Sequence, residues 1–179
     1  MIKTINFDMD GVLVDLSKNL AKLDGYDEPV LWYLHKFEDD GKYVYPKSIE
    51  RHIDDECFVT CQPMPYYEEM KKLIRHLHSK GYKINILSSC MDQEYSDKIV
   101  KQKVAWLHKY YGAEMHMFSQ VNIVRGSKLK INYIDENAIL IDDYLKTQNS
   151  FIENGMGDQF IFYRNFNECV EQLIEKNII

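Results

Sequence analysis

The sequence Asp8-Met9-Asp10-Gly11-Val12-Leu13-Val14-Asp15 follows a short run at positions 2–7 that has the composition of a buried or half-buried β-strand. Because successive strand side chains point to opposite faces, Asp8 and Asp10 should share one side at the carboxyl end of this strand. Gly11 lets the chain turn sharply directly after them. The stretch therefore predicts a strand that ends in two convergent carboxylates.

Two carboxylates at one point repel each other unless a cation or a proton lies between them. Their hard oxygen atoms are the ligands that Mg²⁺ prefers, and the carboxyl edge of an open α/β sheet is where ligands bind. A solvated acidic turn after a surface strand would give the same local sequence. The pair indicates a Mg²⁺ site only in combination with the rest of the chain.

The composition is that of one globular domain. The chain has 179 residues, of which 45% are hydrophobic, enough for a core and a small insertion. A formal net charge of −6 disfavours a nonspecific polyanion-binding surface, although a metal and a few placed cations could still hold a phosphate. We expect no signal peptide, no membrane span and no stable nucleic-acid partner. Free thiols in a reducing cytoplasm are expected for the cysteines, which are Cys57, Cys61, Cys90 and Cys169.

Apolar periodicity divides the chain into an α/β core and an insertion. Helix-spaced leucines and turn signals at 16–61 predict a small helical cap inserted after the first strand. The core would comprise 1–15 and 62–179 and would be a Rossmann-like three-layer sandwich with a mainly parallel five-stranded sheet. Later strands are expected at 82–87, 115–118, 138–141 and 160–162, between helices that end near Gly81, Gly112 and Lys176.

Polar residues recur at the carboxyl ends of the expected strands, or just before one. They are Asp8 and Asp10, Ser88 and Ser89, Lys128 or Lys130, and Asp142 and Asp143. In a parallel sheet all these ends lie on one edge, so the side chains should meet. Together they suit phosphoryl transfer, because one carboxylate can attack phosphorus and another can move a proton. Acidic residues can hold Mg²⁺, and a hydroxyl and a lysine can bind the phosphoryl oxygens.

This ordered set resembles the haloacid dehalogenase-like (HAD) phosphohydrolase superfamily. Within it the chain is most similar to the 5'(3')-deoxyribonucleotidase family, through DMDGVLVD at 8–15, the Gln-Pro-Met-Pro return at 62–65, LSSC at 87–90, the helix end from Trp106 to Gly112, and LIDDY at 140–144. The resemblance implies a Mg²⁺-dependent phosphomonoesterase. It would hydrolyse (deoxy)ribonucleoside monophosphates to nucleoside and phosphate through an aspartyl-phosphate intermediate.

The resemblance also implies roles for individual residues. Asp8 would be the nucleophile and Asp10 the general acid/base, which would also give the metal a backbone carbonyl. Asp142 would complete the Mg²⁺ ligands, and Asp143 would support them from behind. Ser88 would contact the transferred phosphoryl group.

Four further residues are expected around the substrate. Ser89 and Gly11 would lie beside the phosphoryl group, and Lys128 would hold the phosphate and orient Asp8. Lys130 competes with Lys128 for that position, because the gap to the acidic pair is longer than the family pattern. Phe58, in the cap, is expected to stack on the base.

Other functions fit the same residues. The chemistry could act on a sugar phosphate or on the 3'-phosphate end of a nucleic acid. A phospho-acceptor signalling module also gathers carboxylates, a hydroxyl and a lysine at one sheet edge, but it carries its adjacent acidic pair early and lacks a long insertion after the first strand. A catalytically silent binding protein is a further alternative. The preferred base, the position of the phosphate and the formation of a homodimer are open from sequence.

Overall fold

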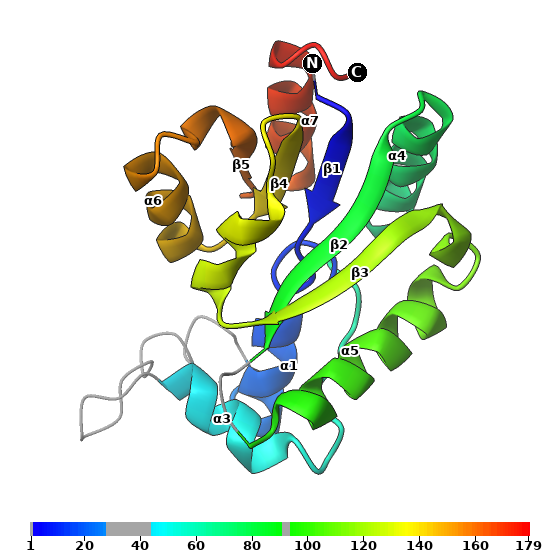
Figure 1. The fold of residues 1–179 in the computed structure, drawn as a ribbon. Helices are drawn as coiled ribbons and strands as arrows, with labels where there is room; N and C mark the ends of the chain where they lie inside the picture. The colour runs from blue at the N-terminus through cyan, green and yellow to red at the C-terminus, as the bar shows by residue number, and fades with distance from the viewer. Residues whose placement is uncertain (1, 28–43, 91–93) are drawn as a thin grey trace.

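The centre of the protein is a parallel five-stranded sheet with strand order β3-β2-β1-β4-β5 (Figure 1). The structure is a computed structural model, and it describes residues 2–27, 44–90 and 94–179. The strands are β1 (Thr4–Phe7), β2 (Lys83–Cys90), β3 (Phe118–Arg125), β4 (Ala138–Asp142) and β5 (Phe160–Phe162). The predicted α/β class with a parallel sheet is confirmed.

Helices alternate with these strands and cover the sheet. The α-helices are α1 (Leu16–Leu23), α3 (Val44–His52), α4 (Tyr67–Ser79), α5 (Ser96–Tyr111), α6 (Leu145–Glu153) and α7 (Phe166–Glu175). Three short 3₁₀ helices are η1 (Met115–Met117), η2 (Ser127–Tyr133) and η3 (Gly157–Gln159). In the described part of the chain, no helix has the length and apolar character needed to cross a membrane.

The two faces of the sheet pack against different helices, which gives the three layers. In β4, Ile139 and Ile141 join the larger apolar cluster, which also takes buried residues from α4, α5 and α7. Leu140, between them, joins a smaller cluster with Phe151 of α6. Because β4 is buried on both faces, its sequence is a continuous apolar run that is easily read as a strand.

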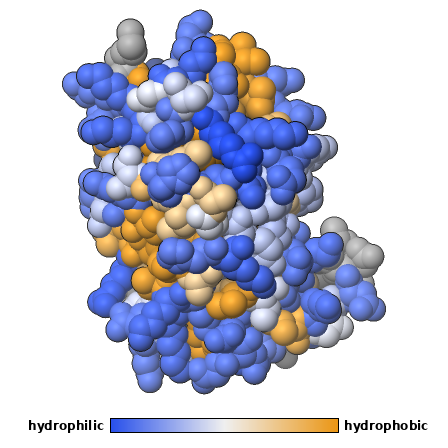
Figure 2. Space-filling model, turned by 90° about the vertical axis from the view of Figure 1, so that its right-hand side faces the viewer, coloured by the Kyte–Doolittle hydropathy of each residue, from blue (hydrophilic) through white to orange (hydrophobic). Residues whose placement is uncertain are grey.

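The third strand differs from the prediction. The sequence 115–118 was expected to form it, but 115–117 is the 3₁₀ helix η1 and the strand runs from Phe118 to Arg125. It lies at the edge of the sheet, where Ser119 and Gln120 are exposed, so its apolar pattern is weak. On the side of the molecule that carries β3 and α5, apolar residues surface in separate areas among hydrophilic ones (Figure 2).

The two ends of the predicted cap lie side by side at the carboxyl edge of the sheet. The Met64 N–H donates to the Leu13 carbonyl at 2.9 Å, and the Asp15 N–H donates to the Gln62 carbonyl at 3.0 Å. Beyond the point where these two hydrogen bonds join the ends of the cap, α1 and α3 lie past the carboxyl ends of β1 and β2 (Figure 1). The division into a core and a cap at 16–61 stays a prediction, and 28–43 lie outside the described residues.

Candidate active site

The site begins where β1 and β4 end together. Phe7 is paired with Ile141, and the Asp8 N–H donates to the Ile141 carbonyl at 2.9 Å. This register brings Asp8 to the level of Asp142, although the two residues are far apart in the sequence. The predicted meeting of the first and fourth strand ends is therefore present.

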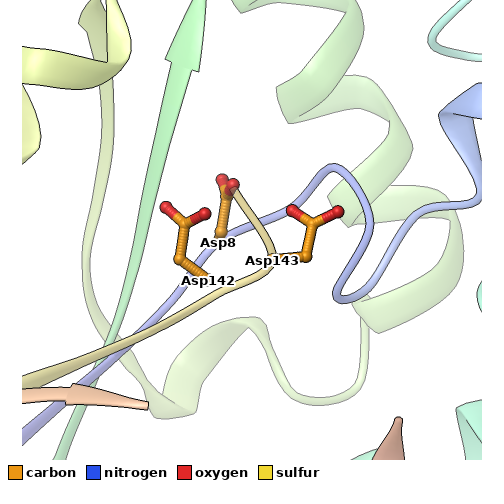
Figure 3. A group of neighbouring side chains, drawn as sticks. All are labelled: Asp8, Asp142 and Asp143. Atoms are coloured by element: carbon orange, nitrogen blue, oxygen red, sulfur yellow. The ribbon is translucent and has the colours of Figure 1, made fainter. Parts of the chain in front are cut away.

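Three carboxylates gather at this edge (Figure 3). Asp8, Asp142 and Asp143 each offer an oxygen atom, and these atoms lie within 4.8 Å of one another. Asp8 and Asp142 are buried, whereas Asp143 is exposed at the surface of the group. These three residues, together with the lysine described next, are called the acidic cluster below.

Lys130 is the lysine of the acidic cluster. Its ammonium lies 2.7 Å from Asp8 Oδ2 and 2.6 Å from Asp142 Oδ2, and its side chain is only 1% exposed. Lys128, which the resemblance placed here, is exposed. The prediction of Lys128 for this position is wrong by two residues, because η2 has about three residues per turn and so points Lys128 and Lys130 in different directions.

The electrostatics of the acidic cluster reflect its excess of negative charge. Burial and then the Asp8 charge raise the pKa of Asp142 to about 6, against the opposing effect of Lys130. Reduced hydration and then repulsion from Asp8 and Asp142 raise the pKa of Asp143 to about 8. Burial opposes the charge of Lys130, but Asp8 and Asp142 outweigh it and raise its pKa.

A second group of polar side chains lies beside the first. Asp10 does not point at the acidic cluster's lysine; its Oδ2 atom accepts from the Lys103 ammonium at 2.6 Å. The same ammonium donates to Ser88 Oγ at 2.9 Å and to the Ser89 carbonyl at 2.7 Å. Burial raises the pKa of Asp10, and the Lys103 charge opposes that shift. Asp10, Ser88 and Lys103 are called the Lys103 group below.

Lys103 is a residue of the site that the sequence analysis missed. It comes from α5, and its side chain is 1% exposed. Its position four residues after Ile99 and three before Trp106 places it on the buried face of the helix. A lysine within an apolar stripe was the available signal.

Solved structures with a similar fold were found, although no protein-family model and no curated protein matches the sequence. A haloacid dehalogenase-like family hydrolase from Streptococcus pneumoniae is 16% identical, with a TM-score of 0.53 over 96% of this chain and 90% of that one. CbbY from Rhodobacter sphaeroides, in complex with xylulose 1,5-bisphosphate, is 14% identical, with a TM-score of 0.52 over 93% and 88%. A HAD-family hydrolase from Deinococcus radiodurans with bound phosphate and sodium is 14% identical, with a TM-score of 0.52 over 90% and 79%.

The chain has the haloacid dehalogenase-like fold. The predicted superfamily resemblance is supported at this level, whereas the special similarity to deoxyribonucleotidases stays a prediction. In this haloacid dehalogenase-like fold, the acidic cluster and the Lys103 group lie at the carboxyl edge of the sheet, which is the ligand-binding edge of open α/β sheets.

The donor set of the acidic cluster fits Mg²⁺. Its acidic groups offer carboxylate oxygens, and when all three carboxylates are ionised they face a single ammonium, which leaves two negative charges in excess. The pKa values of Asp142 and Asp143 are raised in part because neighbouring negative charges disfavour ionisation, and a bound cation would offset this repulsion. The expected ligands were Asp8, Asp142 and the backbone carbonyl of Asp10, with Asp143 behind them. In the structure the carboxylate of Asp143 lies close to those of Asp8 and Asp142, and the carboxylate of Asp10 is bound by Lys103. A metal contact from the Asp10 carbonyl stays a prediction.

The remaining predicted residues occupy defined places. Gly11 has a φ of +75°, and a Cβ atom there would overlap the Asp143 carboxylate, so this turn admits only glycine without rearrangement. Ser89 contributes its carbonyl to Lys103. Phe58 is 3% exposed, and its ring lies over the Lys103 ammonium, 5.2 Å from Nζ to the ring centroid. Its stacking on a base stays a prediction.

Proposed function

We propose that this protein is a Mg²⁺-dependent phosphomonoesterase that forms an aspartyl-phosphate on Asp8. The observation that carries the proposal is the acidic cluster: Asp8 lies within 4.8 Å of two further carboxylates and 2.7 Å from Lys130, at the carboxyl edge of a haloacid dehalogenase-like fold. A carboxylate held beside a cation site and a buried lysine can approach an anionic phosphate that it would otherwise repel.

In the first half of the reaction, an oxygen of Asp8 attacks phosphorus. A bond forms between this oxygen and phosphorus, and the bond between phosphorus and the leaving alkoxide breaks. Asp10, in its protonated form, gives its proton to that alkoxide, so the product leaves as an alcohol. Ser88 and Lys130 are placed to bind the phosphoryl oxygens as their charge is redistributed.

In the second half, water replaces the alcohol. Asp10, now a carboxylate, takes a proton from the water as the water oxygen attacks phosphorus. The Asp8–phosphorus bond breaks, and inorganic phosphate leaves. Asp10 is then protonated and Asp8 is free, which are their states at the start, so protons and bonds balance over the cycle.

Asp8, Asp142 and Asp143 would hold the Mg²⁺ ion, with the Asp10 carbonyl as the further ligand that the family resemblance implies. The bound ion would supply positive charge that offsets the repulsion between the carboxylates and the phosphate. Lys130 complements the ion, because its two contacts fix the Asp8 and Asp142 side chains relative to each other.

For the substrate, we propose (deoxy)ribonucleoside monophosphates, on the basis of the deoxyribonucleotidase-like motifs at 8–15, 62–65 and 140–144. A sugar phosphate is the second candidate. It is favoured by the similar fold of the Rhodobacter protein, which was solved with a sugar bisphosphate. The acidic net charge of −6 disfavours a nucleic-acid end.

A phospho-acceptor signalling module is the non-enzymatic alternative. The sheet order β3-β2-β1-β4-β5 disfavours it, because flavodoxin-like signalling modules have the order 2-1-3-4-5. Such a module would keep its aspartyl-phosphate, whereas a phosphatase turns it over. Phosphate release over many turnovers therefore separates the two.

The test is phosphate release from a panel of deoxyribonucleoside and ribonucleoside monophosphates, sugar phosphates and 3'-phosphorylated oligonucleotides, with and without Mg²⁺. We expect Mg²⁺-dependent release that is fastest with a mononucleotide. Asp8→Asn keeps the size of the side chain but removes the nucleophile, and kcat should fall by about 10⁴-fold or more. Full activity of Asp8→Asn would rule out the covalent mechanism, and a preference for sugar phosphates would replace the proposed substrate.

A further inference from the structure

We propose that Lys103 is a positioning residue that fixes the acid/base carboxylate of Asp10 and turns the Ser88 hydroxyl toward the phosphoryl group. The proposal rests on the proposed phosphatase function. It concerns a lysine of helix α5, distinct from Lys130 of the acidic cluster, and 93 residues separate it from Asp10. Three features of the structure carry it.

The first feature is the burial of the Lys103 ammonium. Burying a charge is costly unless it is paired and hydrogen-bonded, and Lys103 is 1% exposed. An ammonium has three N–H donors, and Lys103 has three acceptors, which are Asp10 Oδ2, Ser88 Oγ and the Ser89 carbonyl. Every donor is used by the protein. Lys103 therefore acts on the reaction through the residues that it holds and leaves no N–H for the substrate.

The second feature is the hydrogen bonding of the Ser88 hydroxyl, which accepts from Lys103. A hydroxyl has one proton to donate and two lone pairs that accept. Because Ser88 Oγ accepts from Lys103, its proton must point to another acceptor, and within the described residues no hydrogen bond from this hydroxyl to a protein acceptor is present. Ser88 is fully buried near the carboxyl end of β2, and in the proposed reaction its proton binds a phosphoryl oxygen.

The third feature is the difference in hydrogen bonding between the two oxygens of the Asp10 carboxylate. Lys103 binds Oδ2 at 2.6 Å, whereas Oδ1 is buried and has no hydrogen-bond partner in the part of the chain that the structure describes. A buried oxygen without a partner is costly, so its retention calls for an explanation. The geometry gives one: Lys103 anchors one oxygen, and the other is held ready to exchange a proton with the leaving group or with water.

Neighbours of Lys103 on α5 tie this arrangement to the segment that returns from the cap. The Gln102 side-chain amide donates to the Ile53 carbonyl at 2.6 Å, and its oxygen accepts from the Phe58 N–H at 3.2 Å. The Trp106 ring N–H donates to the Cys61 carbonyl at 3.0 Å. These bonds join the segment that carries Phe58 to α5, and the Phe58 ring lies over the Lys103 ammonium.

The test compares wild type with Lys103→Met, which keeps the length of the side chain but removes the charge and the donors. Lys101→Met, an exposed lysine of the same helix, is the matched control. Two substrates are used: the best alkyl phosphate of the panel, whose leaving group needs a proton, and p-nitrophenyl phosphate, whose leaving group does not. Circular dichroism checks folding, and calorimetry measures Mg²⁺ binding to the acidic cluster, which Lys103 does not contact.

We expect kcat/KM of Lys103→Met, which reports the half-reaction in which the leaving group departs, to fall roughly 100-fold with the alkyl phosphate and less than about tenfold with the aryl phosphate, because a positioned acid contributes about that much. Mg²⁺ affinity should be nearly unchanged, and Lys101→Met should match wild type. If Lys103→Met does not fold, the same ratio of substrates is measured on Lys103→Gln, which keeps an N–H donor.

Equal losses with the two substrates, or no loss with either, would overturn the positioning role of Lys103 while leaving the phosphatase function intact. A folded Lys103→Met protein with weakened Mg²⁺ binding would also overturn it, because the residue would then act on the acidic cluster. A wild-type protein that releases phosphate from no substrate overturns the proposed function itself. The inference about Lys103 falls with it.

Discussion

Asp8 and Asp10 lie two residues apart, yet each is bound by a different buried lysine from a different part of the chain. Asp8 belongs to the acidic cluster, whose lysine comes from the 3₁₀ helix η2. Asp10 belongs to the Lys103 group, whose lysine comes from the long helix α5. The segment that leads into the turn at Gly11 therefore contributes one carboxylate to each of two neighbouring groups.

The two groups differ in charge. The acidic cluster sets three carboxylates against one ammonium, so it attracts a further cation. The Lys103 group sets one carboxylate against one ammonium and is balanced. This difference in charge fits the separate roles that the resemblance implies for Asp8 and Asp10. In the proposed reaction, the acidic cluster binds the cation and the Lys103 group transfers the proton.

The largest effect on stability should come from removing the lysine of the acidic cluster. Lys130→Met leaves the buried carboxylates of Asp8 and Asp142 without the lysine that pairs with their charge, and breaking such buried pairs costs roughly 3–5 kcal/mol. Urea unfolding without Mg²⁺ measures the change. Lys128→Met should stay within about 0.5 kcal/mol of wild type because its side chain is exposed. Equal losses in the two variants would contradict the placement of Lys130.

Mg²⁺ should stabilise the protein through the acidic cluster and not through the Lys103 group. A ligand at 100 times its Kd stabilises the folded state by about 2.7 kcal/mol, which thermal unfolding detects as a rise in Tm. Asp142→Asn should remove most of this rise, whereas Lys103→Met should keep it. A rise that survives in Asp142→Asn and disappears in Lys103→Met would reverse the assignment of the two groups.

The sequence predicted the centre of this arrangement because its strands are buried on both sides. β4 is buried throughout, and its unbroken apolar run ends directly in Asp142. The DxDG sequence after β1 likewise predicted a strand that ends in carboxylates and a sharp turn. Parallel strands place such ends on one edge by rule, so the meeting of Asp8 with Asp142 followed from pattern alone.

The lysines could not be predicted in the same way. The choice between Lys128 and Lys130 depends on which face of a seven-residue helical segment packs against the sheet, and periodicity over so few residues does not show this. Lys103 was missed because its place in the site depends on an ion pair with Asp10, which is 93 residues away in the sequence. No local sequence pattern indicates such a tertiary contact. The strand β3 was misplaced because an edge strand with exposed polar residues carries little apolar signal.

A smaller effect is expected at Gly11, where the two groups meet. Gly11→Ala introduces backbone strain at a φ of +75° and pushes the Asp143 carboxylate away, for a cost of about 1–3 kcal/mol. Gly81→Ala is the matched control, because its φ is +89° and a Cβ atom there meets nothing within 4 Å. Both variants should lose stability, but only Gly11→Ala should lose Mg²⁺ affinity by calorimetry. Unchanged affinity would remove Asp143 from the cation site.

The smallest effect should come from Phe58, whose ring lies over Lys103. Phe58→Leu keeps the apolar volume near Lys103 but loses the ring over its ammonium, at a cost of about 1 kcal/mol. Phe151→Leu, a buried phenylalanine on the α6 face, is matched for burial and loses a comparable ring contact with Phe160. Because only Phe58 touches the Lys103 group, kcat with an alkyl phosphate should fall several-fold in Phe58→Leu and stay unchanged in Phe151→Leu, with the rise of Tm in Mg²⁺ preserved in both. If kcat fell equally in the two variants, the loss would come from general loosening of the core and not from the contact between Phe58 and Lys103.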